Sequence, residues 1–538
     1  MRDLFNKTVH GINNTGLVIW TAVFLVVFTN ITFFSNLTGV YPFGIKNILF
    51  LGSLLLFSIG LLVLILAPFC FRFTIKPVLI TILLVSSLTA YFMDAYNVII
   101  DDSMINNIAH TDLNESMDLF SIKLVLYFIL LGVAPSFFVY RVNIEGGTFW
   151  KEFLSRVKLV VVVVLVMMLL VYAQSDYYSS FFREHKQLRY YANPTHFIYS
   201  IGKYAANHTK TGARVLNTIG LDAKIPETDK HRELIIFVIG ETARADRFSL
   251  NGYEKETTPL LEKESVFSFN NFWSCGTTTA YSVPCMFSIY GSDEFSEEKG
   301  ATSENVLDVL KRAGVNVVWL DNNSDSKGVA DRVEYQSYKS PVVNHDCLPE
   351  CHDEGMLENL QTYINEHPQG DIFIVLHQLG NHGPAYYKRY PAEFQKFTPV
   401  CKTNQLEECT KEEIDNAYDN AILYTDHFLA KVIELLKKNE KGFESAMFYV
   451  SDHGESLGEG GFYLHGLPNF IAPDEQKHVP AVLWLSKNFD DVDREKLAAG
   501  HNQKYTHDNL FHTILGFMEV ETSIYDKSLD ILYGSKQD

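Results

Sequence analysis

Basic residues are scarce in this 538-residue sequence, where 45 Lys and Arg face 64 Asp and Glu and the formal net charge is −19. Clustered Lys and Arg are what phosphate contacts require, so general nucleic-acid binding is excluded. Gly (32) and Pro (17) are too few, and aromatics at 13% too many, for a collagen-like, low-complexity or largely disordered chain. No pair of the seven cysteines has CxxC spacing, which disfavours a zinc ribbon.

Charged residues of either sign are especially rare in residues 1–175. A hydrocarbon core ~30 Å thick requires roughly 20 mainly apolar helical residues to cross it. Five segments meet this requirement: 17–36, 47–67, 77–96, 122–141 and 158–175. The first is followed by no small-residue cleavage pattern and by four further spans, so we interpret it as a membrane span and not as a cleavable signal peptide. The sequence predicts a five-span transmembrane domain over residues 1–175.

The basic residues that flank these spans predict their orientation. They precede span one and lie between spans two and three and between spans four and five: Arg2, Lys7, Arg72, Lys76, Arg141, Lys151, Arg156 and Lys158. The alternate loops are poor in basic residues, and the loop at 97–121 is acidic. The positive-inside rule therefore predicts a cytoplasmic N-terminus and, after an odd number of spans, an exported C-terminal part.

Cysteine usage gives an independent indication of export. Six of the seven cysteines follow the last span, in the short-spaced pairs Cys275 and Cys285, Cys347 and Cys351, and Cys401 and Cys409. In an exported domain this spacing suggests three local disulfides.

The exported part begins with a polar, aromatic stretch and then changes pattern. We interpret residues 176–232 as a linker with interfacial helices, since the Tyr and Phe of 177–194 suit a membrane–water boundary. An ordinary pair of surface helices fits this stretch as well. Residues 233–538 are predicted to form an α/β catalytic domain with a mainly parallel sheet, because short apolar runs alternate with helical stretches. The expected strands are 234–240, 315–320, 372–376, 446–450 and 479–485, and the expected helices are about 302–313, 354–366 and 413–438.

Metal-ligating side chains follow several of these strands. Glu241 follows the first, Asp452 and His453 follow the fourth, and Asp321, His377 and His382 follow two others. In such sheets, active sites form beyond the carboxyl ends of the strands. A mixed oxygen and nitrogen set of this kind is typical of zinc, and His465 is a further candidate ligand. A capping role for Asp452 and a core position for His453 is the structural alternative.

A nucleophile is expected in the segment CGTTTAYSVPC (275–285). A disulfide between its two cysteines would hold the loop rigid, as a nucleophile needs for near-attack geometry. Coordination to a metal would activate a threonine hydroxyl, whose pKa is otherwise far above neutrality. Composition does not choose among Thr277, Thr278 and Thr279, and a Thr-rich turn is the alternative.

Five longer motifs resemble those of the lipid A phosphoethanolamine transferases, a family that includes chromosomal and mobile colistin-resistance enzymes. They run in the family's order across the exported domain: GETARADRFSLNGY (240–253), SCGTTTAYSVPCMFS (274–288), DNNSDSKGV (321–329), HQLGNHGPAY (377–386) and SDHGESLGE with YLHG (451–459 and 463–466). The resemblance implies an alkaline-phosphatase/sulfatase-like α/β fold beside the five-span membrane domain.

The resemblance also implies roles for individual residues. Thr279 corresponds to the family's nucleophile and is a zinc ligand together with Glu241, Asp452 and His453. The family positions matching Lys327, His382 and His465 contact the phosphoryl group or a second zinc, and Asn323 and His377 flank them as further substrate-binding candidates. Thr278, often Ser in relatives, is a mild departure.

The acidic loop between the third and fourth spans carries a further family pattern. Asn107, Thr111 and Glu115 recur at i, i+4 and i+8, which places them on one face of a helix. The family uses this pattern to hold the ethanolamine head group, and Glu115 would suit its ammonium. A solvated helical face is the plain alternative.

The function expected from the resemblance is a two-step transfer in the bacterial inner membrane. Thr279 takes phosphoethanolamine from phosphatidylethanolamine, and a lipid A phosphate then takes it from the threonine, with one zinc tightly bound and a second possible. Such a modification lowers lipid A's negative charge and is expected to confer polymyxin and colistin resistance. We expect a monomer in contact with membrane lipids. The alternatives are a phosphoglycerol or phosphoethanolamine transferase acting on another envelope glycan or protein, and a non-catalytic binding module on a decayed hydrolase scaffold.

Overall fold

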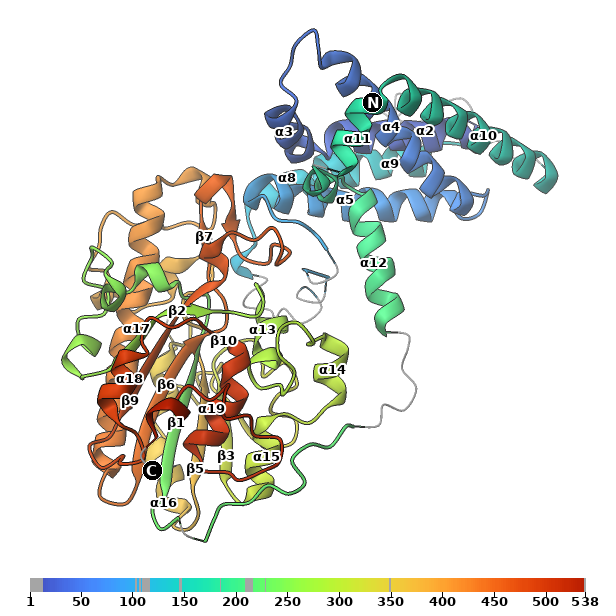
Figure 1. Cartoon of the computed structure of the whole chain (residues 1–538). Coiled ribbons are helices and arrows are strands. Elements are labelled where there is room, and N and C mark those ends of the chain that lie inside the picture. Colours follow the sequence, from blue (N-terminus) through green and yellow to red (C-terminus); the bar gives the residue numbers. More distant parts are fainter. Residues whose placement is uncertain are drawn as a thin grey trace. The chain divides into compact units, whose positions relative to one another are not determined.

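The computed structural model describes residues 13–101, 104–105, 108, 117–144, 148–183, 185–208, 216–227, 229–347 and 350–536. These residues form two compact units (Figure 1). One unit covers 1–105 and 120–208 and is helical, whereas the other covers 106–119 and 209–538 and contains the large sheet. We refer to them as the helical unit and the catalytic unit.

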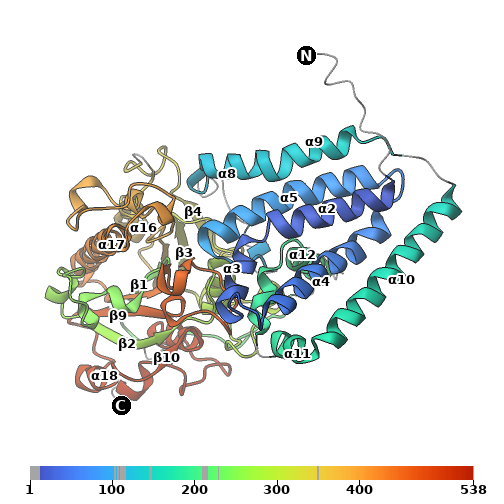
Figure 2. The same ribbon diagram turned by 90° about the horizontal axis from the view of Figure 1, so that it is seen from above.

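The helical unit is built from long apolar helices, several of which pack against one another (Figure 2). Among the described residues, four helices are long and apolar enough to cross a membrane, or five if one bent pair counts as a single span. They are α4 (Ile48–Leu66, extended by the 3-10 turn η1, Ala67–Phe69), α5 (Ile75–Tyr96), the run of α8 (Ile122–Tyr127), the π-helical turn η2 (Phe128–Val133) and α9 (Ala134–Arg141), and α10 (Phe149–Ala173). After α10 come α11 (Ser175–Arg183), the 3-10 helix η3 (Lys186–Tyr191) and α12 (Thr195–His208).

The first span differs from the continuous helix expected at 17–36. It is divided into α2 (Asn14–Phe28) and α3 (Ile31–Val40), which are bent by 61° at Thr29 and Asn30. Asn193, from the stretch between η3 and α12, binds this break. Its amide nitrogen donates to the carbonyls of Thr29 (3.1 Å) and Ser86 (2.9 Å), and its own backbone carbonyl accepts from Asn30 (2.7 Å). The break is tolerated because side chains satisfy the carbonyls that a helix would have used.

An eight-stranded sheet forms the centre of the catalytic unit, with strand order β10-β2-β9-β6-β1-β5-β3-β4. The five expected strands are present as β1 (Glu233–Gly240), β3 (Asn316–Asp321), β5 (Ile372–His377), β6 (Glu444–Ser451) and β9 (His478–Leu485). β6, β1, β5, β3 and β4 (Glu334–Ser337) run parallel, and β9 is antiparallel to both of its neighbours. The mainly parallel α/β fold is confirmed.

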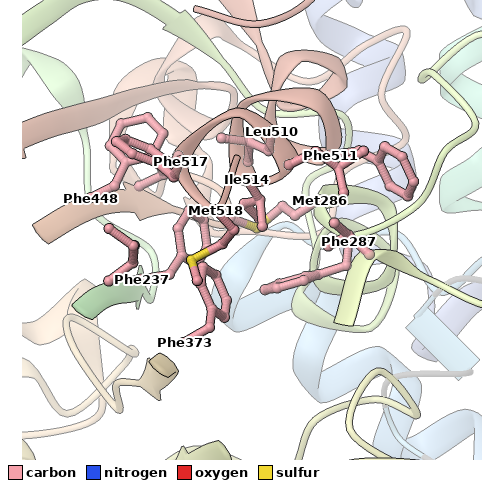
Figure 3. Close-up of a cluster of buried hydrophobic side chains, with 14 of the residues drawn as sticks. Phe237, Met286, Phe287, Phe373, Phe448, Leu510, Phe511, Ile514, Phe517 and Met518 are labelled. Atoms are coloured by element: carbon pink, nitrogen blue, oxygen red, sulfur yellow. The ribbon is translucent and has the colours of Figure 1, made fainter. Parts of the chain in front are cut away.

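Helices cover both faces of this sheet. One face packs against α13 (Thr279–Met286), α15 (Val306–Ala313) and α19 (Leu510–Phe517), and the other against α16 (Leu360–Glu366) and α17 (Lys411–Asn439). On the first face, Phe511, Ile514 and Phe517 of α19 gather with aromatic side chains of the central strands (Figure 3). Strands β1, β5 and β6 are buried along their whole length, which accounts for their continuous apolar runs.

Some elements of the catalytic unit were not predicted from the sequence. β2 (Phe267–Trp273) and β10 (Tyr505–Thr506) form one edge of the sheet, and β4 forms the other. A two-stranded ribbon, β7 (Ser456–Leu457) with β8 (Tyr463–Leu464), stands apart. β2 reads FSFNNFW and is only partly buried, so it lacks the continuous apolar run by which the central strands were recognised. The helix expected at 354–366 begins instead as a 3-10 turn, η7 (Asp353–Leu357), before α16.

All three expected disulfides are present. They join Cys275 to Cys285, Cys347 to Cys351 and Cys401 to Cys409, and Cys70 is a buried free thiol. Each disulfide closes a short loop of the catalytic unit, so none of them links the sheet to a distant segment.

The substitution Asn193→Ala tests the account of the bent first span. It removes three side-chain hydrogen bonds, including the one from Thr89 (3.0 Å). At ~0.6 kcal/mol each, the loss is about 2 kcal/mol. We expect a lower thermal unfolding midpoint for the detergent-purified full chain. Asn47→Ala, which removes a half-buried amide bonded to Pro42, serves as the matched control and should change the midpoint less. An equal change in the two variants would contradict this account.

Candidate functional site

The side chains expected at the carboxyl ends of the central strands do meet there. Glu241 follows β1, Asp452 and His453 follow β6, and His377 is the last residue of β5. β1 pairs in parallel with both β5 and β6, with Ile239 beside His377 and Gly240 beside Ser451, so these ends are in register. The fold therefore brings together residues that are more than 200 positions apart in the sequence.

Glu241, Asp452 and His453 form a compact donor group. All three side chains are fully buried, and their ligand atoms lie within 4.8 Å of one another. His453 Nε2 is 3.5 Å from Glu241 Oε1 and 3.3 Å from Asp452 Oδ2. These separations match the edge of a tetrahedron with metal–ligand bonds of ~2.0 Å, which is about 3.3 Å. The group fits a four-coordinate divalent metal.

Hydrogen bonds fix both carboxylates of this group. Asp452 Oδ1 accepts the backbone N–H groups of Thr242 (3.2 Å) and His453 (2.7 Å), whereas Oδ2 has no hydrogen-bond partner among the described residues. Glu241 Oε2 accepts from the amide of Asn323 (2.7 Å). A buried carboxylate oxygen that faces other donor atoms without a partner is what a metal ligand requires.

Thr279 completes the donor group. Its Oγ1 lies 3.1 Å from Glu241 Oε2 and 3.3 Å from His453 Nε2. It is the first residue of α13, where unpaired backbone N–H groups and the helix dipole favour negative charge. Its neighbours are differently placed: Thr277 Oγ1 donates to the carbonyl of Leu467 (2.7 Å), and the buried hydroxyl of Thr278 has no partner among the described residues. Thr279 is the threonine of this loop that reaches the donor group.

Burial shifts the pKa values of this group toward the uncharged forms. Burial raises the pKa of Asp452 above its ordinary value and lowers the pKa of His453 well below its own. Both shifts disfavour charge, because low-dielectric surroundings penalise ions that lack compensation. A bound cation would compensate two adjacent carboxylates, which again fits a metal site.

Two further histidines extend the site. The rings of His453 and His465 are 4.4 Å apart between centroids, and those of His465 and His382 are 5.6 Å apart. His382 is half-buried, and its buried Nδ1 atom has no partner among the described residues. Burial, followed by the nearby His465, lowers the pKa of His382 well below its ordinary value. Both residues thus lie beside the donor group.

Glu455 is a functional candidate that sequence reasoning missed. It is fully buried; its Oε2 contacts His465 Nδ1 at 2.8 Å, and its Oε1 accepts from the hydroxyl of Tyr386 at 2.7 Å. A carboxylate on Nδ1 fixes the orientation of the ring and leaves Nε2 for other contacts. The DHGES segment contained the signal, because an acidic residue follows the ligand pair, but only the fold reveals its partner.

The remaining predicted residues occupy supporting positions. Asn323 donates to Glu241 and to the carbonyl of Gln378 (2.8 Å), and His377 Nδ1 is 2.9 Å from Asp321 Oδ2. Lys327 is almost buried, and its Nζ donates to Ser324 Oγ at 2.5 Å. The head-group candidates Asn107, Thr111 and Glu115 lie outside the described residues.

Within the described residues, two other groups could hold a metal by proximity, and both lie at the amino ends of the strands. One is Asp229, Glu233 and Asp371, and the other is His231, Glu444 and Asp490. Both sit where β1, β5 and β6 begin, so neither is near Thr279.

Comparison with known proteins gives consistent matches. A family model described as phosphoethanolamine transferase EptA/EptB matches residues 58–209, and a sulfatase model matches residues 233–520. The chain is 44% identical over 485 residues to phosphatidylethanolamine transferase Mcr-1 of Escherichia coli, covering 88% of this chain and 89% of that protein. It is 39% identical over 538 residues to phosphoethanolamine transferase EptA of E. coli K12, covering 97% of each.

A solved structure resembles the chain over nearly its full length. It is the integral membrane protein lipooligosaccharide phosphoethanolamine transferase A from Neisseria meningitidis. The TM-score is 0.93 at 33% identity, covering 98% of this chain and all of that one.

The metal interpretation predicts the metal content of three variants. Asp452→Asn should reduce bound metal from about one per chain to near zero, because it removes a buried anionic ligand. Asn323→Ala should weaken metal affinity about 10–100-fold, since it releases Glu241. Metal analysis of the dialysed full chain measures both effects, with the exposed Asp474→Asn as control. Full metal content in Asp452→Asn would refute the assignment.

Proposed function

Because the chain belongs to the phosphoethanolamine transferase family, we propose that it transfers phosphoethanolamine from phosphatidylethanolamine to a lipid A phosphate, with Thr279 as nucleophile. The observation that carries this proposal is the Thr279 hydroxyl, held 3.1 Å from Glu241 and 3.3 Å from His453. The family relatives named above support the transferred group, and the name of the Neisseria relative supports a lipooligosaccharide acceptor.

The proposed reaction has two displacements at the same phosphorus atom. In the first, Thr279 Oγ1 forms a bond to phosphorus, the bond to the diacylglycerol oxygen breaks, and that oxygen takes up a proton. In the second, an oxygen of a lipid A phosphate attacks the phosphorus of the phosphoethanolamine on Thr279, the bond to Thr279 Oγ1 breaks, and Oγ1 takes up the proton that the attacking phosphate gives up. The threonine hydroxyl is restored, so the chain is unchanged after each turnover.

We propose Zn²⁺ as the metal of the Glu241, Thr279, Asp452 and His453 group. Three oxygen donors and one imidazole nitrogen in a tetrahedral arrangement suit zinc. When bound, zinc would supply positive charge that lowers the pKa of the threonine hydroxyl and offsets charge on the phosphoryl oxygens. The remaining steps depend on residues of the chain itself.

Three side chains around the donor group are assigned to the phosphoryl group and to proton transfer. Lys327 supplies a cation for the equatorial oxygens, whose charge must be balanced during transfer. Burial lowers the pKa of His382 well below its ordinary value, and the rings of His382 and His465 can exchange a proton with the departing alkoxide. Glu455 orients His465 through Nδ1, so we assign Nε2 as the atom that faces the substrate. His382 and His465 would also be the residues to hold a second zinc, should one bind.

The helical unit is proposed to lie in the bacterial inner membrane. Its four or five apolar helices have the length of membrane spans, and the donor is a lipid of that membrane. The distribution of basic residues places the N-terminus in the cytoplasm and the catalytic unit in the periplasm. The three disulfides of the catalytic unit support an oxidising compartment.

Mass spectrometry of lipid A tests the transferred phosphoethanolamine, the acceptor and the nucleophile together. A host that expresses the chain should contain lipid A heavier by one phosphoethanolamine, and diacylglycerol should accumulate. Thr279→Val should abolish both changes because it removes the hydroxyl at nearly constant volume.

Thr278→Val is the matched control for this experiment. Its hydroxyl has no partner among the described residues, so activity should fall by less than about threefold. Unmodified lipid A despite folded wild-type chain in the membrane would redirect the proposal to another envelope glycan or protein acceptor. Zinc-free wild-type protein that consumes no donor lipid would favour a non-catalytic module.

Polymyxin susceptibility gives a physiological prediction. Each added ethanolamine places an ammonium at the membrane surface, where one charge is worth ~1 kcal/mol, or about fivefold in the binding of a cationic peptide. Cells expressing the wild-type chain should therefore bind polymyxin less and grow at higher concentrations, whereas cells expressing Thr279→Val should not. Equal susceptibility of the two strains at equal expression would argue against lipid A as the acceptor.

A further inference from the structure

Asp118 is a residue from the N-terminal part of the sequence that belongs to the catalytic unit. It lies in residues 106–119, which follow α5 and precede α8 along the chain, yet this segment is grouped with residues 209–538. Three residues of the catalytic unit bind it, and we call them the Asp118 socket: Lys388, Arg389 and Asn404. Lys388 and Arg389 donate to its carboxylate, and Asn404 donates to its backbone carbonyl at 2.6 Å.

The contact between Asp118 and Arg389 is a buried ion pair. Their side chains are 8% and 2% exposed, and Arg389 Nη2 lies 2.5 Å from Asp118 Oδ2. Burial acts to raise the pKa of Asp118, but Arg389 and Lys388 outweigh it and hold that pKa below its ordinary value. Two charges taken out of water require close pairing, so this contact specifies one position for Asp118.

Two of the three disulfides support the socket. Arg389 also donates to Glu350, which lies inside the loop closed by Cys347 and Cys351. Asn404 lies inside the loop closed by Cys401 and Cys409. The socket is thus preorganised by covalent links on two sides, as a binding site for one side chain should be.

The same guanidinium reaches the catalytic centre. Arg389 Nε donates to the backbone carbonyl of His382 at 2.6 Å, and the His382 ring packs 5.6 Å from that of His465. Arg389 therefore contacts Asp118 on one side and the backbone of an active-site histidine on the other. One residue separates the docked segment from the reaction centre.

We propose that Asp118 is a positioning residue that docks residues 117–119, just before α8, onto the rest of the catalytic unit for reaction with a membrane-bound donor. Residue 208 already connects the two units along the chain, and the docked segment adds a second connection. A second tether raises the effective concentration of the catalytic centre at a membrane-bound donor. The inference rests on the proposed function, because it concerns the same transfer from a lipid.

Two donors separate docking from chemistry. The full chain is reconstituted in vesicles that contain phosphatidylethanolamine, and p-nitrophenyl phosphoethanolamine serves as a water-soluble donor. In Asp118→Asn, the ratio of kcat/KM for the lipid to kcat/KM for the soluble donor should fall about tenfold or more. In His382→Gln that ratio should stay near the wild-type value, because both donors need the histidine. Asp118→Glu should recover part of the lost ratio.

A matched variant and a double variant control the test. Asp308→Asn alters another nearly buried carboxylate paired to an arginine, Arg332, in a helix that contributes nothing to the site, and its ratio should not change. The double variant Asp118→Asn with Arg389→Gln should lose no more lipid-donor activity than Arg389→Gln alone, since both act through one contact. An unchanged ratio in Asp118→Asn, or additive losses in the double variant, would overturn the proposal.

Hydrogen exchange tests docking without any reaction. In Asp118→Asn, backbone amides between His382 and Arg389 should exchange faster than in Asp308→Asn, because Arg389 loses a partner that holds it. Equal exchange in the two variants would overturn the docking proposal even if transfer activity is present. If the wild-type chain uses neither donor but amide exchange still differs between Asp118→Asn and Asp308→Asn, the proposed function is refuted and docking remains supported.

Discussion

The structure depends on the burial of two carboxylates and an imidazole side by side at one edge of a parallel sheet. Glu241, Asp452 and His453 have no solvent access, and low-dielectric surroundings make adjacent carboxylates repel strongly. Several surrounding groups reduce the free-energy cost of burying these two charges. Backbone N–H groups bind Asp452, the amide of Asn323 binds Glu241, and the N-terminus of α13 adds a positive field. A bound cation would supply the compensating charge that neutral donors do not.

The sheet accounts for the precision of this arrangement. Strands β6, β1 and β5 are buried along their whole length and pair in register, so their ends move little relative to one another. Residues placed one position after such strands inherit that rigidity, which a loop-borne site would lack. The proposed nucleophile, Thr279, instead begins α13 after a loop, and there the Cys275–Cys285 disulfide and the contact of Thr277 with Leu467 provide the rigidity that a strand would otherwise supply.

What the sequence could predict follows from how local each signal is. Fully buried strands are continuous apolar runs in the sequence, so these strands and the candidate metal-binding residues that follow them were predicted. The partly buried β2 has no such run and was not predicted. The bend at Asn30 was missed because its stabilising partner, Asn193, is 163 positions away. The choice of Thr279 over its two neighbours followed from the family resemblance, and the geometry of the loop supports it. Glu455 and Arg389 were missed because their roles consist of tertiary contacts, which no local spacing encodes.

The placement of the disulfides connects redox environment to chemistry. Cys401 and Cys409 pack in the core on the face covered by α16 and α17, and Cys275 and Cys285 form a small buried cluster with Phe295. One closes the loop that carries Thr279, and the other two enclose Glu350 and Asn404, which hold Arg389 and Asp118. Each covalent link thus lies where a surface loop must keep one side chain in place. An oxidising compartment would therefore matter to the geometry of the site, because a reduced chain loses the bracing of these loops.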